Sequence, residues 1–166
     1  MSALLVRPEV FRDRMASFNY EYLSFEVRKM ARGVKYEGAT GNRELAIVWL
    51  GGVSSVKSSK GEWARVGGRA TVFEGLPYTL YLPVASDFTI TAETDSDLAF
   101  CYCRAEEEKP ARLVTPGEVR VEIRGGGNAT RQIHHMLPPE FPAQRLLVVE
   151  VFTPAGNWSS YPPHKH

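Results

Sequence analysis

The sequence lacks several features that would point to a particular class of protein. It has only two cysteines, Cys101 and Cys103, too few for a disulfide framework and too close together to bond easily with each other. Its formal net charge of +1 gives no basic surplus for binding phosphates, so we expect no nucleic-acid partner. No apolar run approaches the roughly 20 residues that span a bilayer, so we expect no membrane partner.

The N-terminus lacks the apolar core of a signal peptide, because residues 1–15 place Arg and Glu where that core should lie. The two cysteines read as reduced thiols, and together these features favour a cytoplasmic protein. The chain also shows no Ser-His-Asp arrangement and no paired carboxylates. Acyl transfer and glycoside hydrolysis therefore find no support in the sequence.

What the sequence does contain is a series of short strand-like segments, separated by turns rich in its 14 glycines and 11 prolines. Residues 22–30 alternate between apolar and polar, whereas residues 44–52 form a continuous apolar run, expected of a strand covered on both faces. One short helix is predicted over residues 8–16. The pattern predicts an all-β domain, either a sandwich or a jelly roll. Further strands are predicted within residues 62–66, 69–75, 78–84, 87–94, 97–105, 117–125, 128–137 and 145–156.

The sharpest candidate site is the pair His164 and His166. In an extended segment, residues i and i+2 share a face, so both imidazoles could ligate one ion. Neutral imidazole suits Zn, Fe, Mn or Ni when a carboxylate completes the ligand set. Two imidazoles alone hold a metal poorly, and a solvated C-terminus is the alternative interpretation.

Other cysteines and histidines give weaker signals. Cys101 and Cys103 share a strand face, so a zinc site with paired cysteines and histidines is one hypothesis. Their apolar surroundings favour the alternative, that both are small buried core residues. His134 and His135 are adjacent, so in a strand they point to opposite faces and cannot easily serve one site.

The segment RGGGNATRQIHHML, residues 124–137, joins a glycine-rich turn to two polar candidates, Asn128 and Arg131. Backbone N–H groups in such a turn can bind an anion, and Arg131 could hold a carboxylate through two parallel hydrogen bonds. No helix is predicted after the turn, which excludes a P-loop or a dinucleotide fingerprint. A tight turn between strands is the alternative.

Glu74, Tyr78 and Tyr81 surround a Gly-Leu-Pro turn. Carboxylate and aromatic groups at the mouth of a barrel would suit a sugar. Ordinary strand–turn–strand chemistry explains the same residues equally well.

Three segments together resemble the 5-deoxy-glucuronate isomerase family of myo-inositol catabolism: VFEGLPYTLYLP, RLVTPGEVRVEIRGGGNATRQIHHML and VFTPAGNWSSYPPHKH. The resemblance runs from about Tyr20 to the C-terminus, and GNWSSYPPHKH is its most specific part. The family is similar in fold to the 5-keto-4-deoxyuronate isomerases, so the resemblance implies a protein of two cupin domains, each a small β-barrel or jelly roll. It implies an N-terminal cupin over residues 1–144, then a connecting strand and the start of a second cupin over residues 145–166.

The resemblance also implies a reaction and its ligands. The reaction is the metal-dependent aldose–ketose isomerisation of 5-deoxy-glucuronate to 5-dehydro-2-deoxygluconate, with Zn, Mn, Fe or Ni as the ion. His164 and His166 would be the first two ligands, and a glutamate and a third histidine would follow on later strands. The 166-residue chain alone is therefore expected to hold metal weakly and to be inactive. Arg131 and Asn128 are the candidates for binding the sugar-acid substrate, and no general base is assigned.

A non-catalytic cupin module is the alternative function, serving assembly or binding a sugar through residues 125–131. An exposed apolar face is expected near Leu146, Val148 and Val149, where a second domain would pack. Association into a homo-oligomer is expected to follow from such a face.

Overall fold

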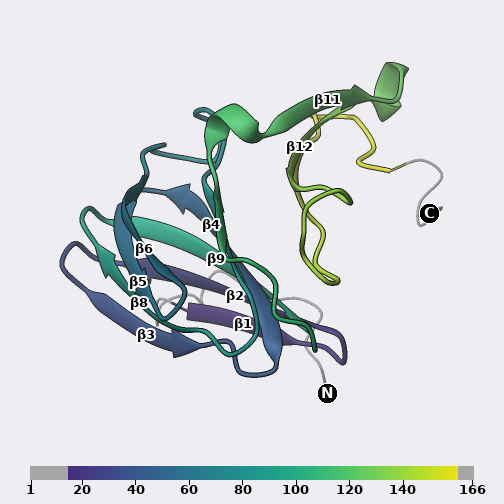
Figure 1. Cartoon of the computed structure of the whole chain (residues 1–166). Coiled ribbons are helices and arrows are strands. Elements are labelled where there is room, and N and C mark those ends of the chain that lie inside the picture. Colours follow the sequence, from purple (N-terminus) through teal and green to yellow (C-terminus); the bar gives the residue numbers. More distant parts are fainter. Residues whose placement is uncertain (1–14, 161–166) are drawn as a thin grey trace.

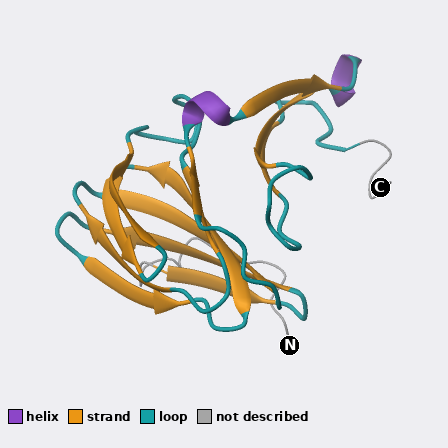
Figure 2. Ribbon diagram, viewed as in Figure 1, coloured by secondary structure: helices purple, strands orange, loops and turns teal. Residues whose placement is uncertain are grey.

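The described part of the chain consists of strands joined by loops, with very little helix. A computed structural model describes residues 15–160, and within that range no helix is long and apolar enough to cross a membrane. Figure 2 shows strands joined by loops and by short helical turns of the 3-10 type. These are η2 (Pro116–Glu118) and η3 (Gly127–Ala129). The strands are β1 (Met15–Asn19), β2 (Leu23–Met30), β3 (Lys35–Ala39), β4 (Arg43–Gly51), β5 (Val53–Ser58), β6 (Gly61–Gly67), β7 (Thr79–Leu82), β8 (Asp87–Ala92), β9 (Ser96–Arg104), β10 (Arg112–Val114), β11 (Arg120–Arg124), β12 (Arg131–Leu137) and β13 (Val148–Phe152).

Two antiparallel sheets enclose the main core. One has the strand order β1-β2-β9-β4-β7-β10 and the other β3-β8-β5-β6 (Figure 1). Trp49, Ile90 and Phe100 are among the fully buried side chains between them. Burying an apolar side chain of this size contributes about 1.5–3 kcal/mol before the entropy cost. The interior of this barrel is therefore a packed core.

Strand β4 is central because both of its faces are covered. Leu45 and Trp49 point into the main core, whereas Ala46 and Val48 belong to a second core on the other face of the six-stranded sheet. This confirms the prediction that residues 44–52 form a strand buried on both sides. Polar residues could not alternate along such a strand without losing contact with water.

The second core joins the six-stranded sheet to the segment between β12 and β13. Phe141 packs edge to face against Tyr81 of β7, with ring centroids 5.4 Å apart. Leu146 and Val148 are 3% and 8% exposed and belong to the same core. The expected exposed face near Leu146, Val148 and Val149 is therefore wrong for the first two residues, because this domain covers them itself.

The exposed apolar residues of this segment are those that alternate in sequence with the buried Leu146 and Val148. Leu147, Val149 and Val151 are 64%, 48% and 42% exposed. Successive residues in a strand point to opposite sides, so these three share the side that Val148 and Glu150 do not use. We call Leu147, Val149 and Val151 the β13 stripe.

Strands β11, β12 and β13 form a separate antiparallel sheet, which Figure 1 shows to one side of the other two. The register pairs Gln132 with Phe152, and His134 with both Val121 and Glu150. Directly paired residues of antiparallel strands point to the same face. One face of this sheet therefore gathers polar and aromatic side chains from β12 and β13.

The predicted strands are confirmed in most segments and wrong in one. Residues 69–75 form the loop between β6 and β7, because the Arg69 side chain binds backbone carbonyl groups of this loop and turns the segment back on itself. The predicted helix over residues 8–16 lies outside the described residues except for Met15 and Ala16, which belong to β1.

Candidate ligand-binding site

The predicted metal ligands His164 and His166 lie outside the described residues. Within residues 15–160, no group of three or more His, Cys, Asp or Glu side chains could hold a metal ion. Cys101 and Cys103 are free thiols that pack in or against the second core. Burial raises the pKa of Cys101 to about 11, so the thiol stays protonated at neutral pH. The interpretation of the two cysteines as core residues is confirmed.

The glycine-rich turn anchors the segment that precedes the tail. The backbone N–H of Trp158 donates to the Asn128 carbonyl at 2.7 Å, and the Asn157 side-chain amide donates to the Thr130 carbonyl at 2.8 Å. In both hydrogen bonds the turn provides a carbonyl oxygen as the acceptor. Binding of an anion would require the turn to provide N–H donors instead. Asn128 itself is exposed, and its role in substrate binding stays a prediction.

Gly125 and Arg131 shape this turn. Gly125 has a φ of +88°, and a Cβ there would lie 2.2 Å from the Ala129 carbonyl oxygen, which excludes any larger residue. Nη1 of Arg131 donates to the same oxygen at 3.0 Å. Its other N–H groups have no hydrogen-bond partner among the described residues, and its role in substrate binding stays a prediction.

A chain of four polar side chains links the three-stranded sheet to the β6–β7 loop. Nε2 of Gln132 lies 2.6 Å from Nε2 of His134, and Nδ1 of His134 lies 3.1 Å from a carboxylate oxygen of Glu150. Glu150 accepts two further hydrogen bonds from Arg69, at 2.7 and 3.1 Å. Because the Gln132 amide nitrogen can only donate, we assign the proton of neutral His134 to Nδ1, where it donates to Glu150.

Arg69 anchors this chain, and sequence reasoning missed it because no motif surrounds it. Its side chain is 3% exposed. Its Nε donates to the Trp49 carbonyl at 2.9 Å, and Nη1 lies 3.4 Å from the carbonyl oxygens of Val72 and Gly75. The guanidinium therefore ties β4 and the β6–β7 loop to Glu150 of β13. Full pairing of both charges makes their burial tolerable.

A cavity of about 770 Å³ opens beside this chain, between the β6–β7 loop and the three-stranded sheet. Phe73 and Phe152 meet edge to face in it, with ring centroids 5.8 Å apart. A neighbouring cavity of about 310 Å³ shares both phenylalanines with it and reaches His134. The polar residues that line the larger cavity include Thr130, Arg131, Gln132 and Glu150. Of the two predicted substrate-binding residues, the structure brings only Arg131 to this place.

The residues predicted to bind a sugar at a barrel mouth are not brought together. Glu74 is exposed, whereas Tyr78 packs against the main core. The hydroxyl of Tyr81 donates to Glu44 at 2.8 Å, and burial together with that carboxylate raises the pKa of Tyr81. These tyrosines serve packing, so the sugar hypothesis for this cluster is wrong.

Glu44 is fully buried and yet fully paired. Besides the Tyr81 hydroxyl, it accepts the backbone N–H groups of Gln144 at 2.9 Å and Arg145 at 2.8 Å. It thereby fastens the segment between β12 and β13 to the six-stranded sheet. The sequence could have indicated this contact, because Glu44 stands at the start of a continuous apolar strand. A charge buried there requires hydrogen-bonding partners from elsewhere in the chain.

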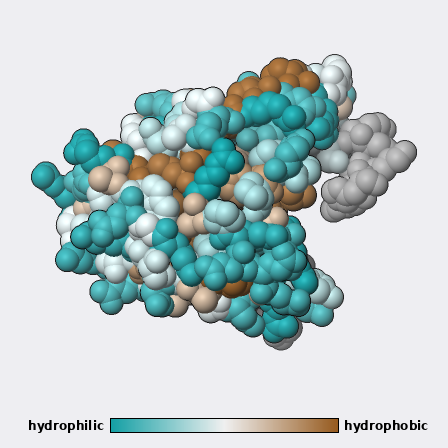
Figure 3. Space-filling view, in the orientation of Figure 1, coloured by the Kyte–Doolittle hydropathy of each residue, from teal (hydrophilic) through white to brown (hydrophobic). Residues whose placement is uncertain are grey.

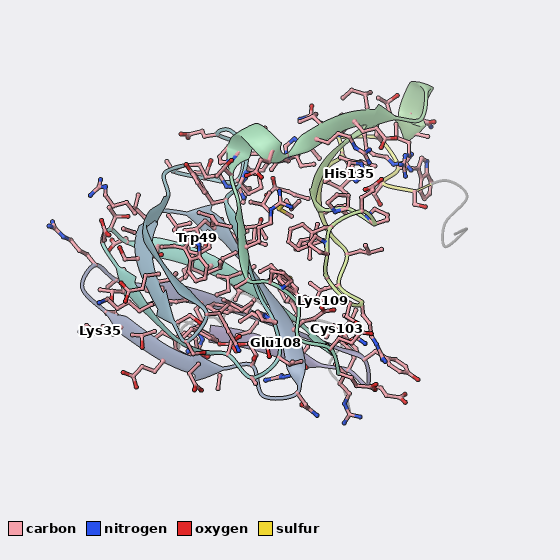
Figure 4. The ribbon with its side chains drawn as sticks, viewed as in Figure 1. Lys35, Trp49, Cys103, Glu108, Lys109 and His135 are labelled. Atoms are coloured by element: carbon pink, nitrogen blue, oxygen red, sulfur yellow. The ribbon has the colours of Figure 1, made fainter. Side chains whose placement is uncertain are left out.

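His134 and His135 point to opposite faces of β12, as predicted. Nε2 of His135 lies 2.9 Å from the Glu122 carboxylate. Figure 4 labels His135 within the three-stranded sheet. The neighbouring Arg124 and then His135 hold the pKa of Glu122 at about 2. Each histidine is therefore the partner of a different carboxylate, on a different neighbouring strand.

A sequence profile of the KduI/IolB family matches residues 9–166. The chain belongs to the KduI/IolB family. The 5-deoxy-glucuronate isomerase of Geobacillus kaustophilus is 44% identical over 158 residues, and that of Bacillus subtilis strain 168 is 38% identical over 147 residues. These alignments cover 95% and 87% of this chain but 57% and 54% of the relatives. This KduI/IolB family chain thus spans little more than half the length of the curated relatives it matches.

A solved structure agrees with this membership. An IolB-like protein from Salmonella typhimurium LT2 superposes on this KduI/IolB family chain with a TM-score of 0.85 and 38% identity, over 89% of this chain and 58% of that one. A putative glyoxylate-induced protein from Pseudomonas aeruginosa, 10% identical, shares the fold alone with a TM-score of 0.58. The all-β cupin-type fold that the resemblance implied is confirmed.

Proposed function

We propose that this chain supplies the first part of a 5-deoxy-glucuronate isomerase. The observation that carries the proposal is the 44% identity to the Geobacillus kaustophilus protein of that name, over 95% of this chain. The chain spans 57% of that relative, so we propose that the complete activity needs further residues. The substrate would be a small sugar acid and the reaction an aldose–ketose isomerisation.

We propose His164 and His166 as the first ligands of a divalent Zn, Mn, Fe or Ni ion. Imidazole nitrogens suit all four ions. The described residues contain no group of three or more side chains that could hold a metal ion, and we propose that the remaining ligands come from outside residues 15–160. Such an ion, when bound, would polarise a carbonyl oxygen of the sugar.

The described residues would support that site. Trp158 and Asn157 tie the segment before the histidines to the glycine-rich turn, which limits the conformations that must be ordered when an ion binds. The filled interior of the barrel also favours a second candidate, a non-catalytic module for assembly or sugar binding. The β13 stripe supports the proposal that the chain forms a homo-oligomer.

The test compares the 166-residue chain with the same chain extended by the second part of the Geobacillus kaustophilus relative. We expect weak metal retention after dialysis and no isomerase turnover for the shorter chain, and both metal and turnover for the extended one. The pair His164→Ala and His166→Ala in the extended chain should remove both. Turnover that survives these substitutions would contradict the assigned ligands, and tightly held metal with turnover in the shorter chain would contradict the need for further residues.

A further inference from the structure

Strand β13 pairs with β12 on one side only, because it lies at the end of the strand order of its sheet. We propose that a second copy of this chain occupies the other side, through antiparallel pairing of the two β13 strands. The two three-stranded sheets then form one six-stranded sheet across the interface. This proposal rests on the homo-oligomer of the proposed function and deepens it by naming the interface.

The backbone along this edge is free to pair. Among the described residues, residues 147–152 make no backbone hydrogen bonds beyond the ladder with β12. In an antiparallel ladder, alternate residues direct their N–H and C=O groups away from the partner strand. Such a row of unpaired groups is a template for pairing with another chain.

Other edge strands of the described chain carry features that block such pairing. Natural edges are protected by short length, charged side chains, proline or bulges. β10 has three residues, and β3 exposes Lys35 and Glu37. The pairing of β6 with β5 is interrupted by a register shift, and Arg65 in β6 has a φ of +52°.

The two edges of the three-stranded sheet differ in the same way. β11 alternates its apolar residues with Arg120, Glu122 and Arg124, and Figure 3 shows hydrophobic side chains where β11 lies, at the upper edge of the molecule. Residues 147–152 contain no Lys, Arg or Pro. Their one charged side chain, Glu150, is 14% exposed and paired with Arg69. The β13 edge is therefore both apolar and unprotected.

The β13 stripe determines the register of the pair. Its apolar residues lie at equal spacing on both sides of Val149, which suits a two-fold contact that uses the same residues on both copies. With Val149 on the axis, Leu147 lies opposite Val151 of the second copy, and all the stripe residues share one face. Centring the pair on Glu150 would set two carboxylates opposite each other, which destabilises a strand pair.

Cysteine cross-linking of the 166-residue chain tests this register. Opposed residues of antiparallel strands have Cβ atoms about 4.5–5.5 Å apart, close to disulfide geometry. Val149→Cys should therefore form a disulfide-linked dimer under mild oxidation. Leu147→Cys is the matched control, because its two copies lie about 13 Å apart along the strands and should give at least about tenfold less dimer.

A mixture of Leu147→Cys and Val151→Cys chains should form the disulfide that neither chain forms alone. The parent chain gives the background, since Cys101 and Cys103 pack in or against the second core. Equal dimer yields from Val149→Cys and Leu147→Cys would overturn the proposal, as would the absence of dimer from Val149→Cys.

Amide hydrogen exchange separates edge pairing from mere stacking of apolar side chains, and it needs no variant. At high concentration of the parent chain, the β13 amides that point away from β12 should exchange at least about tenfold more slowly than in dilute solution. The amides of β3, an edge with exposed charged residues, should show no change. Association without slower exchange in β13 would overturn the pairing and leave the proposed homo-oligomer intact. Neither measurement involves a metal or isomerase turnover, so the proposed activity can fail separately.

Discussion

Burial makes Cys101 an unreactive thiol. Its pKa of about 11 leaves about one thiolate in a thousand at pH 8, and burial also raises the pKa of Cys103. We therefore expect iodoacetamide at pH 8 to label neither cysteine in the folded chain within minutes. The urea-unfolded chain, as the control, should take up two labels by intact mass. Rapid labelling of folded Cys101 would contradict its placement against the second core.

Glu118 and Glu122 make the stability of the fold depend on acid pH. The backbone N–H of Thr115, followed by Arg112, holds the pKa of Glu118 at about 2, and Arg124 with His135 does the same for Glu122. Both values lie below the usual 4.5, so the stabilisation is complete above about pH 4.5 and is lost as the pH falls towards 2.

Thermal unfolding followed by circular dichroism tests this dependence. We expect the Tm of the parent chain to fall between pH 4.5 and 2, and Glu118→Gln/Glu122→Gln to flatten that fall. Glu74→Gln is the control, because Glu74 is exposed and its carboxylate has no hydrogen bond or ion pair among the described residues. An identical pH profile in the double variant and the parent would show that these carboxylates do not carry the effect.

At the scale of elements, the ion pair between Arg69 and Glu150 ties β13 to the β6–β7 loop. Arg69→Leu would leave the largely buried Glu150 without its charged partner, at a cost of about 3–5 kcal/mol. We expect a lower urea midpoint and faster hydrogen exchange of the β13 amides.

The double variant Arg69→Leu/Glu150→Leu is the matched control for this prediction. It removes both charges, so it should recover most of the lost stability. A single variant as stable as the parent would mean that the pair contributes nothing to holding β13.

Strands with a clear hydrophobic pattern in their own sequence could be predicted. Contacts between segments far apart in the sequence could not. The run at residues 44–52 predicts β4 because burial on both faces demands continuous apolar residues. The segment 69–75 has the composition of a strand, but the hydrogen bonds of Arg69 to carbonyl groups of its own loop determine the outcome. Its partner Glu150 lies 81 residues away, and no local pattern connects the two.

The same limit applies to the candidate site. The glycine-rich turn and Arg131 stand out in the sequence because glycine and arginine have specific chemical uses. Phe73, Gln132 and Phe152 come from three separate segments, and each alone is an ordinary strand or loop residue. Only the pairing of β12 with β13, and the approach of the β6–β7 loop, makes a cavity of them.

For the whole molecule, the β13 stripe predicts association. Its three exposed residues, Leu147, Val149 and Val151, form an apolar surface at an edge strand of the three-stranded sheet. We expect light scattering to show a dimer or larger species, and Val149→Lys to shift it towards monomer. Val34→Lys, which charges an exposed valine far from this sheet in sequence, should leave the assembly unchanged. A strictly monomeric parent at high concentration would contradict the prediction.

The position of β9 between β2 and β4 has a consequence for synthesis of the protein on the ribosome. Leu23 pairs with Cys103 and Met30 with Ser96, so β2 cannot gain its partner on this side until β9 has emerged. At about 5–20 residues per second, that delay is several seconds. During this time β2 presents an unpaired edge to neighbouring chains. The ion pair of Arg69 with Glu150 forms later still, so the three-stranded sheet is the last part of the described chain to be secured.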